Sequence, residues 1–407
     1  MIIENTALSA GIVLLAGIIG GKIANYFKLP SVTGYLIAGL LVGPSVLDLF
    51  SGRVLDNLEP INSMALGLIA IMIGGELTKD RIKMISKKLP PIFLAETFLT
   101  FFLVSATAYF ISNSIPLALV LGVLSLATAP AAIVSILKEY RARGEFPQLL
   151  MSLVALDNLL CIIGFGLLTS FLNVLFYQNT GGEQHLVMAL FGEIGLSVLL
   201  GLGIGIILVY TNKMQFSEDK HLVINLGSIL FGVGVAEVLG LPSLLIAMLM
   251  GIMVTNFSSQ RKRFFKLFQK IEIPILIAFL TLAGVKLNLF ILGDVGLLAI
   301  GYILARLFGK IMGARLGSIF SKDLSSAYRK NMGLALTPQA GVAIGLAILA
   351  EDKLPVQDGV IITIILSTVI FFELVGPILV KKSLQNCKSL ENCPDSEPNE
   401  AHPGENA

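Results

Sequence analysis

Charged residues are scarce in this chain: Asp, Glu, Lys and Arg make up only 14% of its 407 residues. It has no tryptophan, three cysteines and three histidines. The cysteine spacing fits no zinc pattern, and no His-Glu-x-x-His motif is present, which argues against an intramembrane metalloenzyme. The histidines, which lie outside the interiors of the apolar segments, are His185, His221 and His402. We therefore expect neither an enzyme nor a cofactor.

Apolar residues dominate instead, at 55% of the chain, and the mean hydropathy is +0.86. A water-soluble protein of this length cannot bury so much apolar surface, and runs of roughly 18 to 25 apolar residues predict transmembrane helices. We predict thirteen of them, at about 8–27, 31–50, 61–78, 91–112, 116–138, 147–175, 186–211, 221–239, 241–256, 272–287, 290–314, 327–350 and 358–380. The chain is thus an all-α polytopic membrane protein whose solvent is the lipid bilayer.

The basic residues predict how the chain is oriented. One set of alternate loops carries Lys and Arg clusters within 79–88, 138–143, 213–220, 261–270 and 315–330, whereas the other set has little beyond Arg53 and Lys353. Because basic loops stay in the cytoplasm, the N-terminus is expected outside and the C-terminus inside the cell (inner) membrane. The net charge of +2 gives no indication of a nucleic-acid partner.

The two ends of the chain differ in character. Residues 1–387 form the expected transmembrane domain, and residues 388–407 are polar and rich in Glu, Pro and Asn. Such a composition is typical of a disordered segment, so we expect a disordered cytoplasmic tail.

Two of the predicted helices carry the same kind of interruption. The first lies in Ser125-Leu-Ala-Thr128-Ala-Pro130 and the second in Leu336-Thr337-Pro338-Gln339-Ala-Gly341. Proline removes a backbone donor and clashes with the preceding turn. In lipid the freed carbonyls need partners, so such breaks persist where they line a polar cavity, and paired breaks point to the ion site of a secondary transporter.

The breaks belong to a longer internal repeat with an offset of about 210 residues. Leu29-Pro-Ser31 matches Leu241-Pro-Ser243, and the Gly-x-x-Leu sequence at 74–77 matches that at 284–287. We expect two six-helix repeats, about 8–175 and 221–380, joined by a linker helix at about 186–211. Because seven helices separate equivalent positions, the second repeat must be inverted in the membrane, with the two discontinuous helices crossing.

Asp157, followed by Asn158, is the strongest candidate for an ion-binding residue. It lies near the middle of its predicted span, where an ionisable group costs about 2.5–3.5 kcal/mol and is functional by default. A carboxylate there can hold either a proton or a desolvated Na⁺ or K⁺. The alternative is a structural carboxylate paired with Lys or Arg.

Lys310 is the second candidate. It can pair with Asp157 when no cation is bound, or extend to the inner interface, and Arg306 one turn deeper could serve instead. Gly309 and Gly313 would let this helix pack closely against a neighbour. Thr128, Thr337 and Gln339 would add neutral oxygen ligands near Asp157, whereas Glu96 is expected near the inner interface. Glu76 and Lys286, at equivalent helix ends, are expected at the interface with a structural role. The carboxylates deep enough in their spans to matter are Glu193, Glu237 and Glu373.

These motifs resemble the monovalent cation:proton antiporter family, in particular the group with Kef-type potassium efflux systems and bacterial Na⁺/H⁺ exchangers. The carrying segments are Leu29 to Pro44, Gly74 to Leu77, Arg306 to Lys310 and Leu336 to Ile344. The resemblance implies a thirteen-helix inverted-repeat fold, a dimerisation domain beside a mobile core domain, elevator-like movement and homodimers.

The chain departs from that resemblance at one position. Electrogenic relatives usually carry Asp-Asp and electroneutral ones often Asn-Asp, with the second residue as the essential acid, whereas this chain has Asp157-Asn158. Either Asp157 has taken over, or the chain is not a standard proton exchanger. The leading hypothesis is electroneutral exchange of Na⁺ or K⁺ for H⁺ on Asp157. The alternatives are a sodium-coupled solute symporter and a non-transporting membrane sensor of the same fold.

Overall fold

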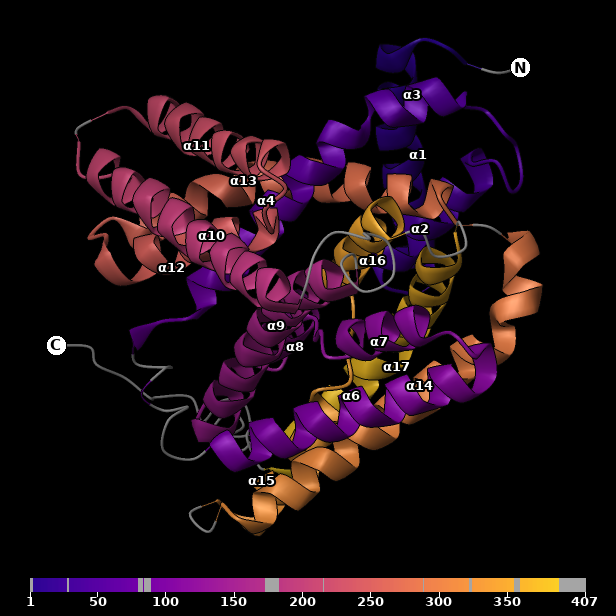
Figure 1. Cartoon of the computed structure of the whole chain (residues 1–407), viewed down its shortest axis with the longest axis vertical. Coiled ribbons are helices and arrows are strands. Elements are labelled where there is room, and N and C mark those ends of the chain that lie inside the picture. The colour runs from indigo at the N-terminus through magenta and orange to yellow at the C-terminus, as the bar shows by residue number, and fades with distance from the viewer. Residues whose placement is uncertain are drawn as a thin grey trace, which may run out of the picture.

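A computed structural model describes residues 3–27, 29–79, 83, 89–172, 183–214, 216–287, 289–321, 324–354 and 359–387. Its helices are α1 (Thr6–Tyr26), α2 (Ser31–Val42), α3 (Gly52–Asn57), α4 (Glu59–Glu76), α6 (Pro90–Ser112), α7 (Ile115–Leu124), α8 (Pro130–Glu139), α9 (Glu145–Leu172), α10 (Glu183–Thr211), α11 (Glu218–Val238), α12 (Ser243–Phe257), α13 (Arg261–Val285), α14 (Leu289–Ile319), α15 (Ser326–Ala335), α16 (Gly341–Lys353) and α17 (Val360–Asn386). The predicted all-α fold is confirmed (Figure 1). The predicted tail, 388–407, lies outside the described residues.

Each predicted span overlaps a helix or a pair of short helices. In the described part of the chain, eight helices are long and apolar enough to cross a membrane by themselves, which makes this a multi-pass membrane protein. The number of thirteen crossings stays a prediction, because several segments, such as α2 and α12, are shorter.

Three predicted boundaries were wrong. The span at 31–50 is helical only to Val42, because Gly43 and Pro44 follow and proline cannot continue a helix. The span at 272–287 begins at Arg261, since a charged, amphipathic stretch precedes its apolar part. The span at 358–380 continues to Asn386, past two lysines that a hydropathy criterion excludes.

Both predicted breaks are present. The first helix stops at Leu124 and resumes at Pro130, and the second stops at Ala335 and resumes at Gly341. Proline is well tolerated at the first position of α8, because the missing N–H has no intrahelical partner there. The backbone N–H of Ala129 donates to the carbonyl of Pro338 at 3.0 Å, so the two unwound segments touch each other.

Two helix pairs pack through glycines at positions that the predicted repeat relates to each other. A Cβ at Gly39 of α2 or Gly284 of α13 would collide with the backbone of the other helix, at Thr281 and Leu36 respectively. A Cβ at Gly251 of α12 or Gly74 of α4 would likewise collide with Ile71 and Met248. The α2–α13 contact thus has the same glycine-mediated form as the α12–α4 contact.

Helices α6 and α14 lie side by side over most of their length (Figure 1). Gly309, Gly313 and Gly317 face α6, and a Cβ at Gly313 would lie 2.5 Å from the Cα of Glu96. The expected close packing at Gly309 and Gly313 is therefore present. It brings the polar side chains of these two helices within direct contact.

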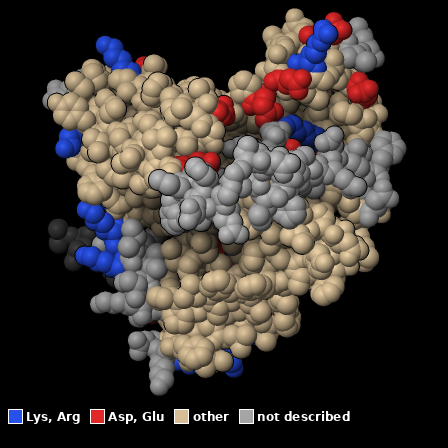
Figure 2. Space-filling view, in the orientation of Figure 1, with Lys and Arg blue, Asp and Glu red and all other residues tan. Residues whose placement is uncertain are grey.

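Large apolar side chains lie on the described surface. Broad areas of the face shown in Figure 2 carry neither basic nor acidic side chains. The large exposed side chains include Phe98 and Phe102 on α6 and Ile206 and Ile207 on α10. Such outward-facing apolar surface suits contact with lipid, while the polar side chains described next are buried.

Candidate functional site

Asp157 lies near the middle of α9 and is only 1% exposed. Its Oδ2 accepts hydrogen bonds from the Thr128 hydroxyl at 2.9 Å and from the Lys310 ammonium at 2.9 Å. Its Oδ1 has no hydrogen-bond partner among the described residues. A buried carboxylate with one free oxygen, one neutral donor and one cationic partner can exchange that partner for a proton or a metal cation.

Asn158 holds the first break in place. Its Nδ2 donates to the carbonyls of Thr128 at 2.7 Å and Val154 at 3.0 Å, and its Oδ1 accepts from the Thr128 N–H at 3.2 Å. The amide therefore replaces backbone partners that the interruption removed. Asp157 contacts the side chain of Thr128 while Asn158 contacts its backbone.

Lys310 is fully buried and has three partners. Besides Asp157, its Nζ donates to the carbonyl of Leu126 at 3.0 Å and forms an ion pair with Glu96. Glu96, expected near the inner interface, has its side chain fully buried beside Lys310, and its depth in the membrane stays a prediction. The close α6–α14 packing, which residue types alone did not reveal, explains the position.

Arg306 stabilises the backbone at both breaks. Its Nε and Nη2 donate to the carbonyls of Ser125 and Ala127, at 2.9 and 2.8 Å, and its Nη1 donates to that of Thr337 at 2.7 Å. The guanidinium also lies 4.4 Å from the ring centre of Phe372. These carbonyls follow the C-termini of α7 and α15, where the helix dipole leaves partial negative charge that a cation stabilises.

The two candidates in the second break do not hydrogen-bond to Asp157 in the described structure. The Thr337 hydroxyl donates to the carbonyl of Leu334 at 2.8 Å. Gln339 Nε2 donates to the carbonyl of Leu124 at 2.9 Å and to the hydroxyl of Tyr302 at 2.8 Å. Tyr302 was missed by the sequence analysis, which offered no signal for a buried tyrosine. Gln339 Oε1 is buried without a hydrogen-bond partner within the described chain, so it could still accept one.

Two of the other ionisable candidates have partners outside the Asp157 cluster. Glu237 accepts from Ser63 at 2.7 Å, and Lys286 pairs with Glu59 at 3.3 Å in a partly exposed contact. Glu373 on α17 is 5% exposed. No cluster of three or more His, Cys, Asp or Glu side chains that could hold a metal ion occurs in the described ranges.

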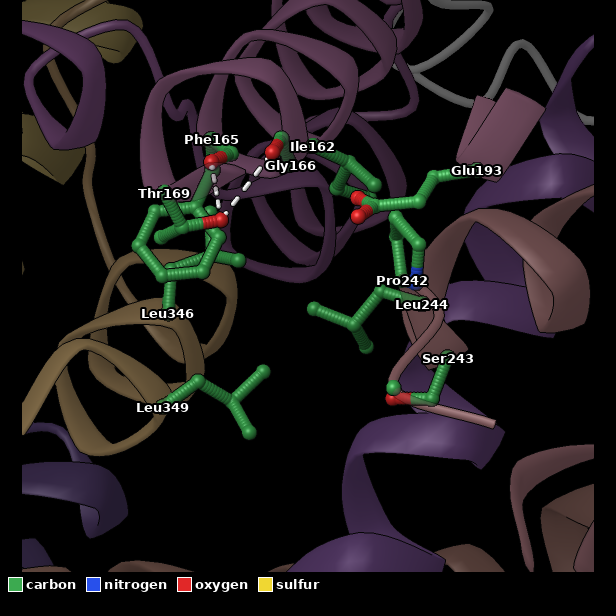
Figure 3. Close-up of a pocket in the computed structure, with 11 residues that line it drawn as sticks. Ile162, Phe165, Gly166, Thr169, Glu193, Pro242, Ser243, Leu244, Leu346 and Leu349 are labelled. Atoms are coloured by element: carbon green, nitrogen blue, oxygen red, sulfur yellow. Dashed lines mark hydrogen bonds between the residues drawn. The ribbon is translucent and has the colours of Figure 1, made fainter. Parts of the chain in front are cut away.

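A crevice lies between α9, α10, α12 and α16 (Figure 3). Ile162, Phe165 and Thr169 of α9 line one side, and Glu193 of α10 and Pro242 face them. Ile162 is five residues beyond Asp157 on the same helix, about 7.5 Å along its axis. The crevice thus approaches the level of Asp157 but does not include it, and the carboxylate is closed off from solvent.

The whole transmembrane region matches a known family. Residues 10–385 match the model of the family described as "Sodium/hydrogen exchanger, transmembrane". The chain therefore belongs to the sodium/hydrogen exchanger family, which confirms the resemblance to cation:proton antiporters.

Individual relatives are more distant. The chain is 27% identical over 142 residues to Na(+)/H(+) antiporter 1 of Methanocaldococcus jannaschii; this match covers 33% of the chain and 32% of the relative, so it spans about a third of that protein. The structure of the sodium proton antiporter MjNhaP1 from the same organism at pH 8 superposes with a TM-score of 0.76 at 17% identity, covering 95% of this chain and 98% of the other. An electron-microscopy structure of MjNhaP1 gives 0.65 at 19% identity, with 98% and 100% covered. At these identities the superpositions show a shared fold.

Proposed function

We propose that this protein exchanges a monovalent cation, Na⁺ or K⁺, for H⁺ across the membrane, with Asp157 as the shared proton and cation carboxylate. The observation that carries the proposal is the buried Asp157–Lys310 ion pair at the junction of two broken helices. Na⁺ is the first cation to test, because the matched relatives are described as sodium antiporters.

The chemistry follows from competition at one carboxylate. A dehydrated cation arriving at Asp157 would displace Lys310 and take the carboxylate together with the Thr128 hydroxyl, which already lies 2.9 Å from Oδ2. A proton arriving at Asp157 neutralises the same carboxylate. Because either occupant adds one positive charge to the site, one-for-one exchange is electroneutral.

Asn158, Arg306 and Gln339 have a supporting part in this proposal. All three hydrogen-bond to backbone carbonyls in or beside the first break, and Arg306 also binds Thr337 of the second. They hold the unwound segments that carry Thr128 and Pro338 beside Asp157. Thr337 and Gln339 remain candidate ligands in a conformation in which the breaks have moved relative to α9.

Three architectural features join the proposal. The matching glycine contacts of α2–α13 and α12–α4 support an inverted repeat of two six-helix units. The Lys and Arg clusters in alternate loops support a cytoplasmic C-terminus. The outward apolar faces leave room for the homodimer that the family resemblance implies.

The test is proton flux in proteoliposomes with an imposed pH gradient, to which Na⁺, K⁺ and Li⁺ are added in turn. The proposal predicts collapse of the gradient by at least one cation in the wild type and none in Asp157→Asn, which removes the titrating charge with little change of shape. No response to any cation in well-folded wild type would contradict exchange and favour the symporter or sensor. A cation-dependent electrical current would contradict electroneutrality alone.

A further inference from the structure

The Lys310 ammonium lies between two carboxylates that come from different helices. Asp157 of α9 is 2.9 Å away, and Glu96 of α6 forms the second ion pair. Both carboxylates and the ammonium are buried, at 1% exposure or less. The other oxygen of Glu96, Oε2, accepts a hydrogen bond from its neighbour Thr97 at 3.3 Å.

The charge balance shows why a second carboxylate matters. If Asp157 were the sole partner of Lys310, a cation on Asp157 would leave the ammonium buried without a counter-charge. An isolated buried charge is strongly disfavoured, so Lys310 would then have to lose its proton. Arg306 cannot supply the missing counter-charge, because it is itself a cation, whose guanidinium donates to the carbonyls of the two breaks.

We propose that Glu96 is a positioning residue for exchange: it keeps Lys310 charged while the cation occupies Asp157, so that Asp157 and not Lys310 carries the exchanged proton. This inference rests on the proposed function. In the proton-loaded site Asp157 is protonated and Lys310 pairs with Glu96. In the cation-loaded site the O–H bond of Asp157 has broken, its proton has left to water, and the Lys310–Glu96 pair is unchanged. The charge of the site is the same in both states.

The groups that act on this pair are few. Asp157 and Cys161 face it from α9, and Arg306 and Tyr302 lie on α14 with Lys310. Helix α7, which also packs on α6, has no titratable side chain. Ionisable residues on the other helices packed on α14 are Tyr328, Arg329 and Lys330 on α15 and Glu373, Lys381 and Lys382 on α17.

The test is the pH dependence of Na⁺-driven proton flux in proteoliposomes, for wild type and Glu96→Gln. With Glu96 neutralised, the exchanged proton moves to Lys310. Because an ammonium holds its proton far more tightly than a carboxyl group (reference pKa about 10.4 against about 3.9), protons compete better with Na⁺. We expect the KM for Na⁺ at pH 7 to rise at least about tenfold. We also expect the low-pH limb of activity, which is the acidic side of the pH profile where flux falls, to move at least about one pH unit towards alkaline pH.

Matched variants separate this role from a structural one. Glu96→Asp keeps the charge and is expected to hold the low-pH limb at the wild-type position, and Glu59→Gln removes a partly exposed carboxylate far from the site. The double variant Glu96→Gln with Lys310→Gln removes both charges of the Lys310–Glu96 ion pair, so the net charge does not change. It replaces Glu96→Gln in the test if that single variant does not fold. Its low-pH limb is expected at the wild-type pH, since Asp157 still carries the proton.

Three results would overturn the inference. The first is a KM for Na⁺ and a low-pH limb in folded Glu96→Gln that equal those of the wild type. The second is a shift of the low-pH limb in Glu96→Asp as large as that in Glu96→Gln. The third is a low-pH limb of the double variant that moves about one pH unit towards acid, which would place the wild-type proton on Lys310. Absence of cation-dependent proton flux in the wild type would instead count against the proposed function itself, so the two failures are distinguishable.

Discussion

At the residue scale, the buried charges divide into two kinds. Asp157, Lys310 and Glu96 contact one another, whereas Arg306 contacts mainly backbone carbonyls. Lys310 binds one carbonyl of the breaks, that of Leu126, whereas Arg306 binds three. This division supports our proposal that Asp157, Lys310 and Glu96 take part in ion exchange while Arg306 supports the breaks.

Replacing Arg306 therefore tests structure rather than transport. Arg306→Met would leave the carbonyls of Ser125, Ala127 and Thr337 buried without their donors, at about 1–3 kcal/mol each. We expect the thermal unfolding midpoint in detergent to fall clearly. Unfolding is monitored by intrinsic tyrosine fluorescence or by aggregation. Arg261→Met, at an exposed position, is the control. Equal midpoints for the two variants would contradict this role of Arg306.

The residues that the sequence identified share one property: they are charged or helix-breaking groups inside apolar runs. Asp157, Lys310, Thr128 and Pro130 were visible for that reason. The pairing of Glu96 with Lys310 could not be predicted, because depth along a helix does not say which neighbour that helix faces. Glu96 meets Lys310 because the glycines of α14 let that helix pack closely on α6, and this contact exists only in the folded chain.

At the element scale, close glycine contacts connect the two halves of the chain. Gly39 and Gly284 pack at α2–α13, and Gly251 and Gly74 pack at α12–α4. The helices themselves could be predicted from hydropathy, except for three of their boundaries. Their pairing could not, since an apolar helix in lipid has no polar face to show which side is buried.

A glycine replacement tests this packing. Gly251→Ala places a methyl group against the backbone of Ile71, and we expect a loss of about 1–3 kcal/mol, seen as a lower thermal unfolding midpoint. Gly203→Ala on α10, where nothing lies within 4 Å of the added carbon, should be neutral or slightly stabilising. A Gly251→Ala variant as stable as Gly203→Ala would contradict the tight α12–α4 contact.

At the scale of the whole molecule, the distribution of charge predicts the orientation. With Cys161, Cys387 and Cys393 replaced by Ser, single cysteines at the exposed positions Arg53→Cys and Arg261→Cys report the two sides. A membrane-impermeant maleimide added to intact cells should label the cysteine at position 53. It should label the cysteine at position 261 only after the cells are permeabilised. The reverse pattern would contradict an outside N-terminus.

The central claim is that a proton and a cation compete for Asp157. The most direct measurement is proton release on addition of Na⁺ to the purified protein in weakly buffered detergent, at a pH on the low-pH limb of activity where Asp157 holds its proton, with bound cation determined in parallel. We predict about one proton released for each cation bound in the wild type, and no release from Asp157→Asn. Cation binding without proton release in the wild type, or equal release from the variant, would contradict it.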